Sequence, residues 1–117
     1  MSVQAELDCD AVVRGFPGLP APYVQVFSYV KPQVAGIPDR RYYLRGVALW
    51  FEVKFGKDKF DKAQYEFLER EYRAGAIVAA GDATALRALI YGPTPSQWRA
   101  PGWQLVLALK AKGFRDE

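Results

Sequence analysis

The sequence predicts an α/β domain with a small mixed β-sheet flanked by helices. Two runs of β-formers, 39–45 and 47–54, meet at Gly46 and predict an antiparallel hairpin. A helical pattern over 59–74 is followed by a short apolar strand at 76–81. The helix between these strands can carry the chain back so that strand 76–81 pairs in parallel. One sheet would then contain both antiparallel and parallel strand pairs.

The remaining elements follow from local patterns, and Gly/Pro-rich connectors separate them. We expect a first helix over 3–13 with Ser2 at its N-cap, a strand at 23–30, a helix over 82–91 capped by Asp82 and a last helix over 103–113. Gly75 is expected to end the helix that precedes strand 76–81.

Length and composition favour one folded domain over residues 1–117. The chain is 50% hydrophobic and 15% aromatic, which is enough for a core of its own. It has no histidine, and this excludes His-based triads and His-ligated zinc sites. Its single cysteine, Cys9, cannot form an internal disulfide and is expected to be a small buried residue. No apolar run is long enough to cross a membrane and the first residues do not resemble a secretory signal, so we expect a cytoplasmic protein.

Positive charge is concentrated in one stretch. Residues 39–62 hold seven basic and four acidic side chains, which accounts for the whole net charge of +3. Such a patch is typical of proteins that bind a polyanion such as nucleic acid. The alternative is a solvated, lysine-rich loop and helix start.

Polar residues on the second hairpin strand raise the question of function. Alternation places Glu52 and Lys54 on one face, about 6.5–7 Å apart along the strand. Pairing about Gly46, with partner numbers summing to about 92, brings Asp39 beside them. Two neighbouring carboxylates raise each other's proton affinity unless a cation lies between them, and Mg²⁺ or Mn²⁺ suits oxygen ligands. The alternative is a turn-capping Asp39 and a surface ion pair.

Gln64 lies within the apolar stripe of the helix predicted over 59–74. A buried glutamine needs hydrogen-bond partners, so Gln64 belongs either to a site at the end of the sheet or to the margin of the stripe, in water. Trp98 and Trp103 either pack the last helix onto the core or stack on bases or a second subunit.

Together these residues resemble a known family. The chain carries "GIPD", then "EVK" with thirteen residues from Asp39 to Glu52, then Gln64 on a helix and "GAIVAAG". This arrangement, over 36–81, resembles the VRR-NUC (virus-type replication-repair nuclease) branch of the PD-(D/E)xK nucleases. The resemblance implies a restriction-endonuclease-like core.

The resemblance also implies roles for individual residues. Asp39 and Glu52 would be ligands of a catalytic Mg²⁺ or Mn²⁺, together with the main-chain carbonyl of Val53. Lys54 would position or activate the attacking water, and Gln64 would orient Lys54 or that water. Many members carry a further acid on the first helix, for which Glu6 is the best candidate here.

The activity implied is divalent-metal-dependent cleavage of DNA, in particular of branched DNA such as four-way (Holliday) junctions, by a homodimer from a phage or bacterium. Backbone phosphates would contact basic residues near the site: Arg41, Lys57, Lys59 and Lys62. Arg40 should point away from Asp39 and belong to a different surface. The alternatives are a flap- or duplex-nicking nuclease, an inactive nucleic-acid-binding module, or a structural protein of a phage.

Overall fold

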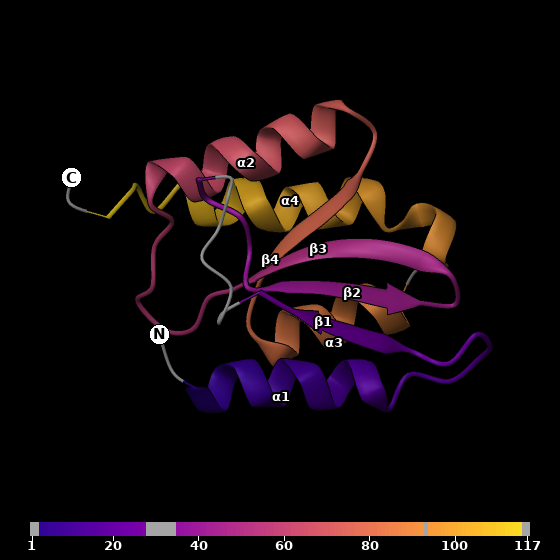
Figure 1. Ribbon diagram of the computed structural model, residues 1–117. Coiled ribbons are helices and arrows are strands. Elements are labelled where there is room, and N and C mark those ends of the chain that lie inside the picture. Colours follow the sequence, from indigo (N-terminus) through magenta and orange to yellow (C-terminus); the bar gives the residue numbers. More distant parts are fainter. Residues whose placement is uncertain (1–2, 28–34, 93, 116–117) are drawn as a thin grey trace.

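The computed structural model describes residues 3–27, 35–92 and 94–115. Within them the chain forms four α-helices, one 3₁₀ helix and four strands (Figure 1). In chain order these are α1 (Val3–Arg14), β1 (Tyr23–Val26), β2 (Arg40–Leu44), β3 (Val47–Val53), α2 (Lys62–Arg73), β4 (Ile77–Gly81), α3 (Ala83–Tyr91), η1 (Pro95–Gln97) and α4 (Arg99–Lys110).

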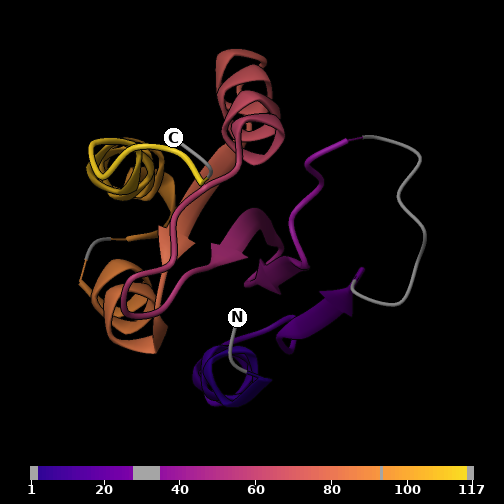
Figure 2. The ribbon, with the colours of Figure 1, turned by 90° about the vertical axis from the view of Figure 1, so that its left-hand side faces the viewer.

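The sheet is mixed, as predicted. Its strand order is β1-β2-β3-β4, with antiparallel β1–β2 and β2–β3 pairs and a parallel β3–β4 pair. Helices α1 and α3 lie on one face and α2 and α4 on the other (Figures 1 and 2). The α2 crossover makes the parallel pairing possible, because parallel neighbours cannot be joined by a tight turn.

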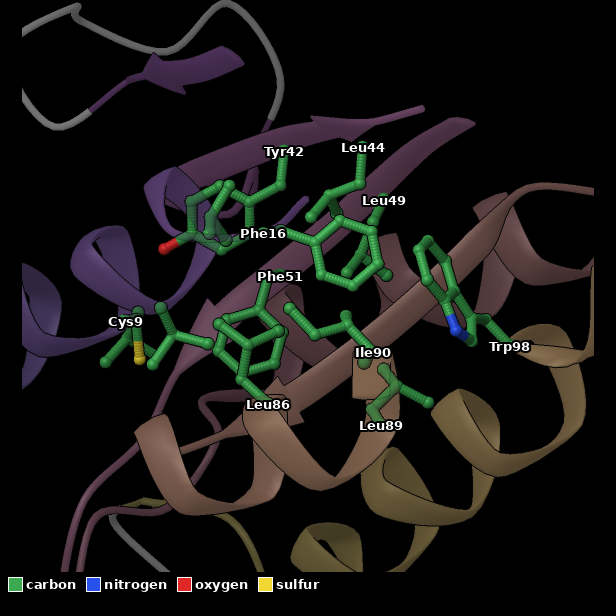
Figure 3. Close-up of a cluster of buried hydrophobic side chains, with 14 of the residues drawn as sticks. Cys9, Phe16, Tyr42, Leu44, Leu49, Phe51, Leu86, Leu89, Ile90 and Trp98 are labelled. Atoms are coloured by element: carbon green, nitrogen blue, oxygen red, sulfur yellow. The ribbon is translucent and has the colours of Figure 1, made fainter. Parts of the chain in front are cut away.

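Each face of the sheet buries its own apolar cluster. The cluster under α1 and α3 includes Tyr42, Leu44, Leu49 and Phe51 from the sheet (Figure 3). The cluster under α2 and α4 includes Trp50. Alternation along β3 therefore assigns odd-numbered side chains to the α1/α3 face and even-numbered ones to the α2/α4 face.

The hairpin register differs by one residue from the predicted one. Partner numbers sum to 91, as in Arg41↔Trp50, because the turn consists of two residues, Arg45 and Gly46. Both have positive φ, 51° and 80°, which suits the twist of a two-residue hairpin. The predicted sum of about 92 is therefore wrong by one.

Helix α2 has signals at both ends. Asp61 caps its start, and Gly75, at φ 101°, follows its end as predicted. The helix starts at Lys62 rather than at residue 59, because the capping box of Asp61 and Gln64 fixes the first turn there. Asp82 caps α3, also as predicted.

Helix α4 begins at Arg99, four residues before the predicted start. Pro101 lies in its first turn, where a missing N–H breaks no helical hydrogen bond. Trp98 is fully buried and contacts the ring of Phe16, while Trp103 stacks on Tyr72 with ring centroids 4.3 Å apart. Both tryptophans therefore pack the C-terminal part onto the core, which confirms that interpretation.

Three further expectations have simple outcomes. Cys9 is fully buried, as predicted. Ser2 and residues 28–30 of the predicted first strand lie outside the described residues. No helix in the described ranges is long and apolar enough to cross a membrane.

Close packing of α4 on β4 yields a first prediction. A Cβ on Gly102 would lie 2.5 Å from the carbonyl oxygen of Val78, whereas one on Gly15 would meet only ordinary contacts. We expect Gly102→Ala to lower the free energy of unfolding by roughly 1–3 kcal/mol, because α4 must move off the strand. Gly15→Ala should change it by less than about 0.5 kcal/mol. Urea denaturation of both variants checks this, and equal effects would contradict it.

Candidate metal centre

Several chain segments meet at one end of the sheet, on the left in Figure 1. They are the carboxyl ends of β3 and β4, the residues that enter β2, and the first turns of α1, α2 and α3. Asp39 directly precedes β2, and continuing the β2–β3 register by one residue places it opposite Glu52. This places the two acids beside each other at this end of the sheet, where Asp39 also raises the pKa of Glu52.

Glu52 is the buried centre of this group. It is 1% exposed, and Lys54 on the same face is 5% exposed. Lys54 Nζ lies 3.7 Å from Glu52 Oε2 and donates to Gln64 Oε1 at 3.0 Å. Gln64 Nε2 donates to Glu52 Oε2 at 3.4 Å. The three predicted residues are thus brought together, and burial rules out the surface ion pair considered for Glu52 and Lys54.

The start of α2 holds Gln64 in place. Its Oε1 accepts from the backbone N–H of Asp61, and its own backbone N–H donates to Asp61 Oδ1. Gly36 packs against the same turn, where a Cβ would lie 2.0 Å from the carbonyl oxygen of Ala63. The loop that leads to Asp39 is therefore in direct contact with the turn that carries Gln64.

Burial makes Glu52 hard to ionise. Removal from water raises its pKa to about 8, and the negative charges of Asp39 and Asp61 act in the same direction. Lys54 lowers the pKa, but not enough to offset the burial. A buried carboxyl group surrounded by acids in this way favours the binding of a further positive charge.

Glu6 adds a third acid from the first turn of α1. Its pKa is raised first by burial and then by the neighbouring carboxyl group of Asp39. Of the other acids on this helix, Asp8 is exposed, while Asp10 is buried and binds elsewhere. The expected N-terminal candidate, Glu6, is therefore the α1 acid that is a neighbour of Asp39.

Arg40 is a residue whose importance the sequence reasoning missed. It points away from the Asp39 side chain as expected, but into the interior rather than to a different surface. Its Nε and Nη2 donate to the two oxygens of Asp10 at 2.8 and 3.1 Å, and Tyr42 Oη donates to Asp10 at 2.8 Å. Its Nη1 donates to the carbonyl oxygen of Asp39 at 3.2 Å, and Nη2 lies 3.8 Å from Glu6. This guanidinium fixes α1 to β2 beside the acids.

One signal could have identified Arg40. It shares its strand face with Tyr42 and Leu44, which belong to an apolar side of the sheet. A charged residue on an apolar face predicts a buried partner of opposite charge, since an unpaired buried charge is costly.

The main-chain carbonyl of Val53 points toward the β2 side of β3. Lys54 N–H, in the same peptide unit, donates to Gly81 of β4 at 2.8 Å, and the carbonyl of a trans peptide points the opposite way. Continuing the β2–β3 register brings Pro38 opposite Val53, and proline has no N–H to donate. The ladder therefore supplies no donor to this oxygen, which lies on the side of the acids.

These donors suit a hard divalent cation. Two carboxyl groups and a carbonyl are all oxygen ligands, and a bound cation would oppose the rise in the pKa of Glu52 that comes first from burial and then from Asp39 and Asp61. Within the described ranges no three acidic or cysteine side chains converge closely enough to form a ready-made cluster. The set matches Mg²⁺, which binds through one or two carboxylates and keeps water or phosphate oxygens in its other positions.

The four predicted DNA-binding residues are not equivalent. Lys57 and Lys62 are exposed and Lys59 is partly exposed, all on or beside the segment that joins β3 to α2. Arg41 lies elsewhere, on β2, with its guanidinium 4.3 Å from the centre of the Trp50 ring. A hollow of about 210 Å³ lies between the ends of β3 and β4 and helix α4, and Lys54 is one of the residues that line it.

Comparison with known proteins finds no matching family model, no matching curated protein and no matching solved structure.

The buried carboxyl group predicts a pH dependence of stability. The folded-state pKa of Glu52 is raised from 4.5 to about 8, so folding favours the protonated form. Its contribution is complete below the unfolded pKa and is lost as the pH rises through about 8. With no histidine in the chain, few other groups titrate between pH 5 and 8.

We therefore expect the free energy of unfolding, measured by urea denaturation in EDTA, to fall from pH 5 to pH 8. One titrating group gives a slope of at most about 1.4 kcal/mol per pH unit. Glu52→Gln should show a flatter profile, because an amide cannot ionise. Stability that rises with pH in the wild type, or identical profiles for both proteins, would contradict this account of Glu52.

Proposed function

We propose that the protein is a divalent-metal-dependent DNA endonuclease of the PD-(D/E)xK type, similar to the VRR-NUC branch. The single observation that carries the proposal is the buried contact of Glu52 with Lys54 and Gln64, opposite Asp39. A structural ion pair does not need a second carboxylate facing it. A phosphodiesterase needs both a place for a cation and a group that handles the attacking water.

The proposed division of labour follows from the geometry. A bound Mg²⁺ or Mn²⁺ would be held by Asp39, Glu52 and the carbonyl of Val53, and it would supply charge stabilisation at the scissile phosphate. Gln64 fixes Lys54 Nζ by accepting its hydrogen bond at 3.0 Å. Lys54 orients the attacking water and holds positive charge beside the phosphate as negative charge develops. Glu6, as a neighbour of Asp39, adds negative charge that a bound cation would offset.

The charge around the site supports DNA as the substrate class. The exposed Lys57 and Lys62 flank the site in sequence and can contact backbone phosphates without reading base sequence. On the family resemblance, we propose branched DNA as the preferred substrate and a homodimer as the acting species. A junction-cutting enzyme needs two sites, which a two-fold dimer supplies.

The activity test uses labelled duplex, flap and four-way-junction DNA, each with EDTA, Mg²⁺ or Mn²⁺. We expect metal-dependent cleavage by the wild type, and a loss of roughly 100-fold or more in Glu52→Gln and in Lys54→Met. Glu66→Gln is the matched control, since Glu66 is an exposed acid on α2 near Gln64. It should cleave like the wild type.

Three outcomes would argue against the proposal. Retained cleavage in Glu52→Gln would show that the activity lies elsewhere. DNA binding without cleavage under any metal condition would favour an inactive binding module. If the protein neither bound nor cleaved any of these DNAs, DNA would be excluded as its partner.

A separate prediction concerns the lysines. Replacing Lys57 and Lys62 together by alanine should weaken binding of duplex DNA irrespective of its sequence. It should also reduce the slope of log K against log salt by about 2, because two phosphate contacts are lost. Fluorescence anisotropy in EDTA at several salt concentrations measures both quantities. An unchanged salt slope would place the DNA on another surface.

A further inference from the structure

One half of the sheet's α2/α4 face is not packed against a described helix. Helices α2 and α4 pack on β4, while α1 contacts β1 from the opposite side (Figure 2). The registers Tyr23↔Tyr43 and Gln25↔Arg41 place these four side chains together on the half formed by β1 and β2. We call this group, Tyr23, Gln25, Arg41 and Tyr43, the open sheet face.

The open sheet face carries two aromatic rings, an exposed Tyr23 and a half-buried Tyr43. Tyr23 is 60% exposed, so most of its side chain is in contact with solvent. Its ring centroid lies 5.8 Å from that of Tyr43, across the strand pair. Aromatic rings on a solvated sheet surface provide flat faces on which nucleic-acid bases stack.

Arg41 adds a positive charge between the rings and the interior. Its guanidinium lies 5.8 Å from the Tyr43 ring and 4.3 Å from the Trp50 ring. Among the described residues, its Nε is a buried side-chain donor without a hydrogen-bond partner. Arg41 is only half-buried, and a guanidinium beside aromatic rings can donate hydrogen bonds to a phosphate or a base edge.

The open sheet face leads directly to the candidate metal centre. Asp39 lies two residues before Arg41 and four before Tyr43 on the same face of the sheet. Tyr43 is therefore about 13 Å from Asp39 along the strand, which leaves room for a short run of nucleotides. Phe27 lies between the open sheet face and the acids. Its backbone N–H donates to the carbonyl of Asp39, and its ring packs on Trp50.

We propose that the open sheet face binds a single-stranded DNA segment by stacking bases on Tyr23 and Tyr43, with Arg41 contacting the backbone. This inference rests on the proposed function for its substrate and deepens it. Among branched DNAs it favours those that carry an unpaired strand, such as a flap, because that strand could leave the metal centre along β1 and β2. A paired duplex cannot place its bases on the rings, because they are already stacked on each other.

The test measures binding in EDTA, so that it does not depend on cleavage. The probes are a fluorescein-labelled oligothymidylate and a blunt duplex of the same length, read by anisotropy. We expect Tyr23→Ala combined with Tyr43→Ala to weaken binding of the single strand by roughly tenfold or more, with little change for the duplex. Replacing both tyrosines by phenylalanine should retain binding of the single strand, because the rings remain.

Tyr91→Ala is the matched control. Tyr91 is also an exposed tyrosine, at 45%, but it contacts Phe16 at the far end of α3. Its loss should leave both affinities unchanged, and circular dichroism should show that all variants are folded. A 2-aminopurine base in the oligonucleotide should also be quenched by the wild type and not by the double alanine variant.

The outcomes separate this inference from the nuclease proposal. Cleavage by the wild type with equal single-strand binding in the alanine variant would overturn the stacking surface and leave the nuclease standing. Loss of single-strand binding in a protein that never cleaves would support the surface without the nuclease. A change in sedimentation of the alanine variant without a change in DNA binding would instead make this face an interface between two copies, and would overturn the inference.

Discussion

The ionisation of Glu52 is the physical constraint on which the candidate site depends. Glu52 is 1% exposed, Asp39 raises the pKa of its carboxyl group, and Lys54 lowers that pKa. That lysine does not prevent the pKa from rising to about 8. At neutral pH the group must therefore either keep its proton or gain another positive charge nearby. A divalent cation would meet this need, and the proposed chemistry follows from it.

The fold brings the components of this site together from distant parts of the chain. A two-residue turn sets the register that places Asp39 opposite Glu52, and the α2 crossover brings Gln64 to the same end of the sheet. On the α1/α3 face of the sheet, Arg40 binds Asp10 and so fixes α1. The first turn of this helix carries Glu6. Positions in the site are thus determined by elements whose own stability comes from the two apolar clusters.

Local signals explain how much of this the sequence could predict. The mixed sheet, the Asp82 cap and the grouping of Glu52 with Lys54 depend on alternation and other short-range signals, which a single sequence displays. The burial of Arg40 against Asp10 depends on a pairing thirty residues apart, and no local pattern specifies it. The one-residue error in register arose because Arg45 adopts a positive φ together with Gly46, which is uncommon for a residue with a side chain.

The most direct test of the central claim is a crystal structure of the protein grown or soaked with Mn²⁺ near pH 8, using the anomalous signal of the metal. The account predicts one strong anomalous peak between the carboxylates of Asp39 and Glu52, about 2.1 Å from their oxygens and near the Val53 carbonyl. The peak should be absent in crystals of Glu52→Gln. Well-ordered wild-type side chains with no metal between them at millimolar Mn²⁺ would contradict it, and Glu52 would then be a structural residue held by Lys54 and Gln64.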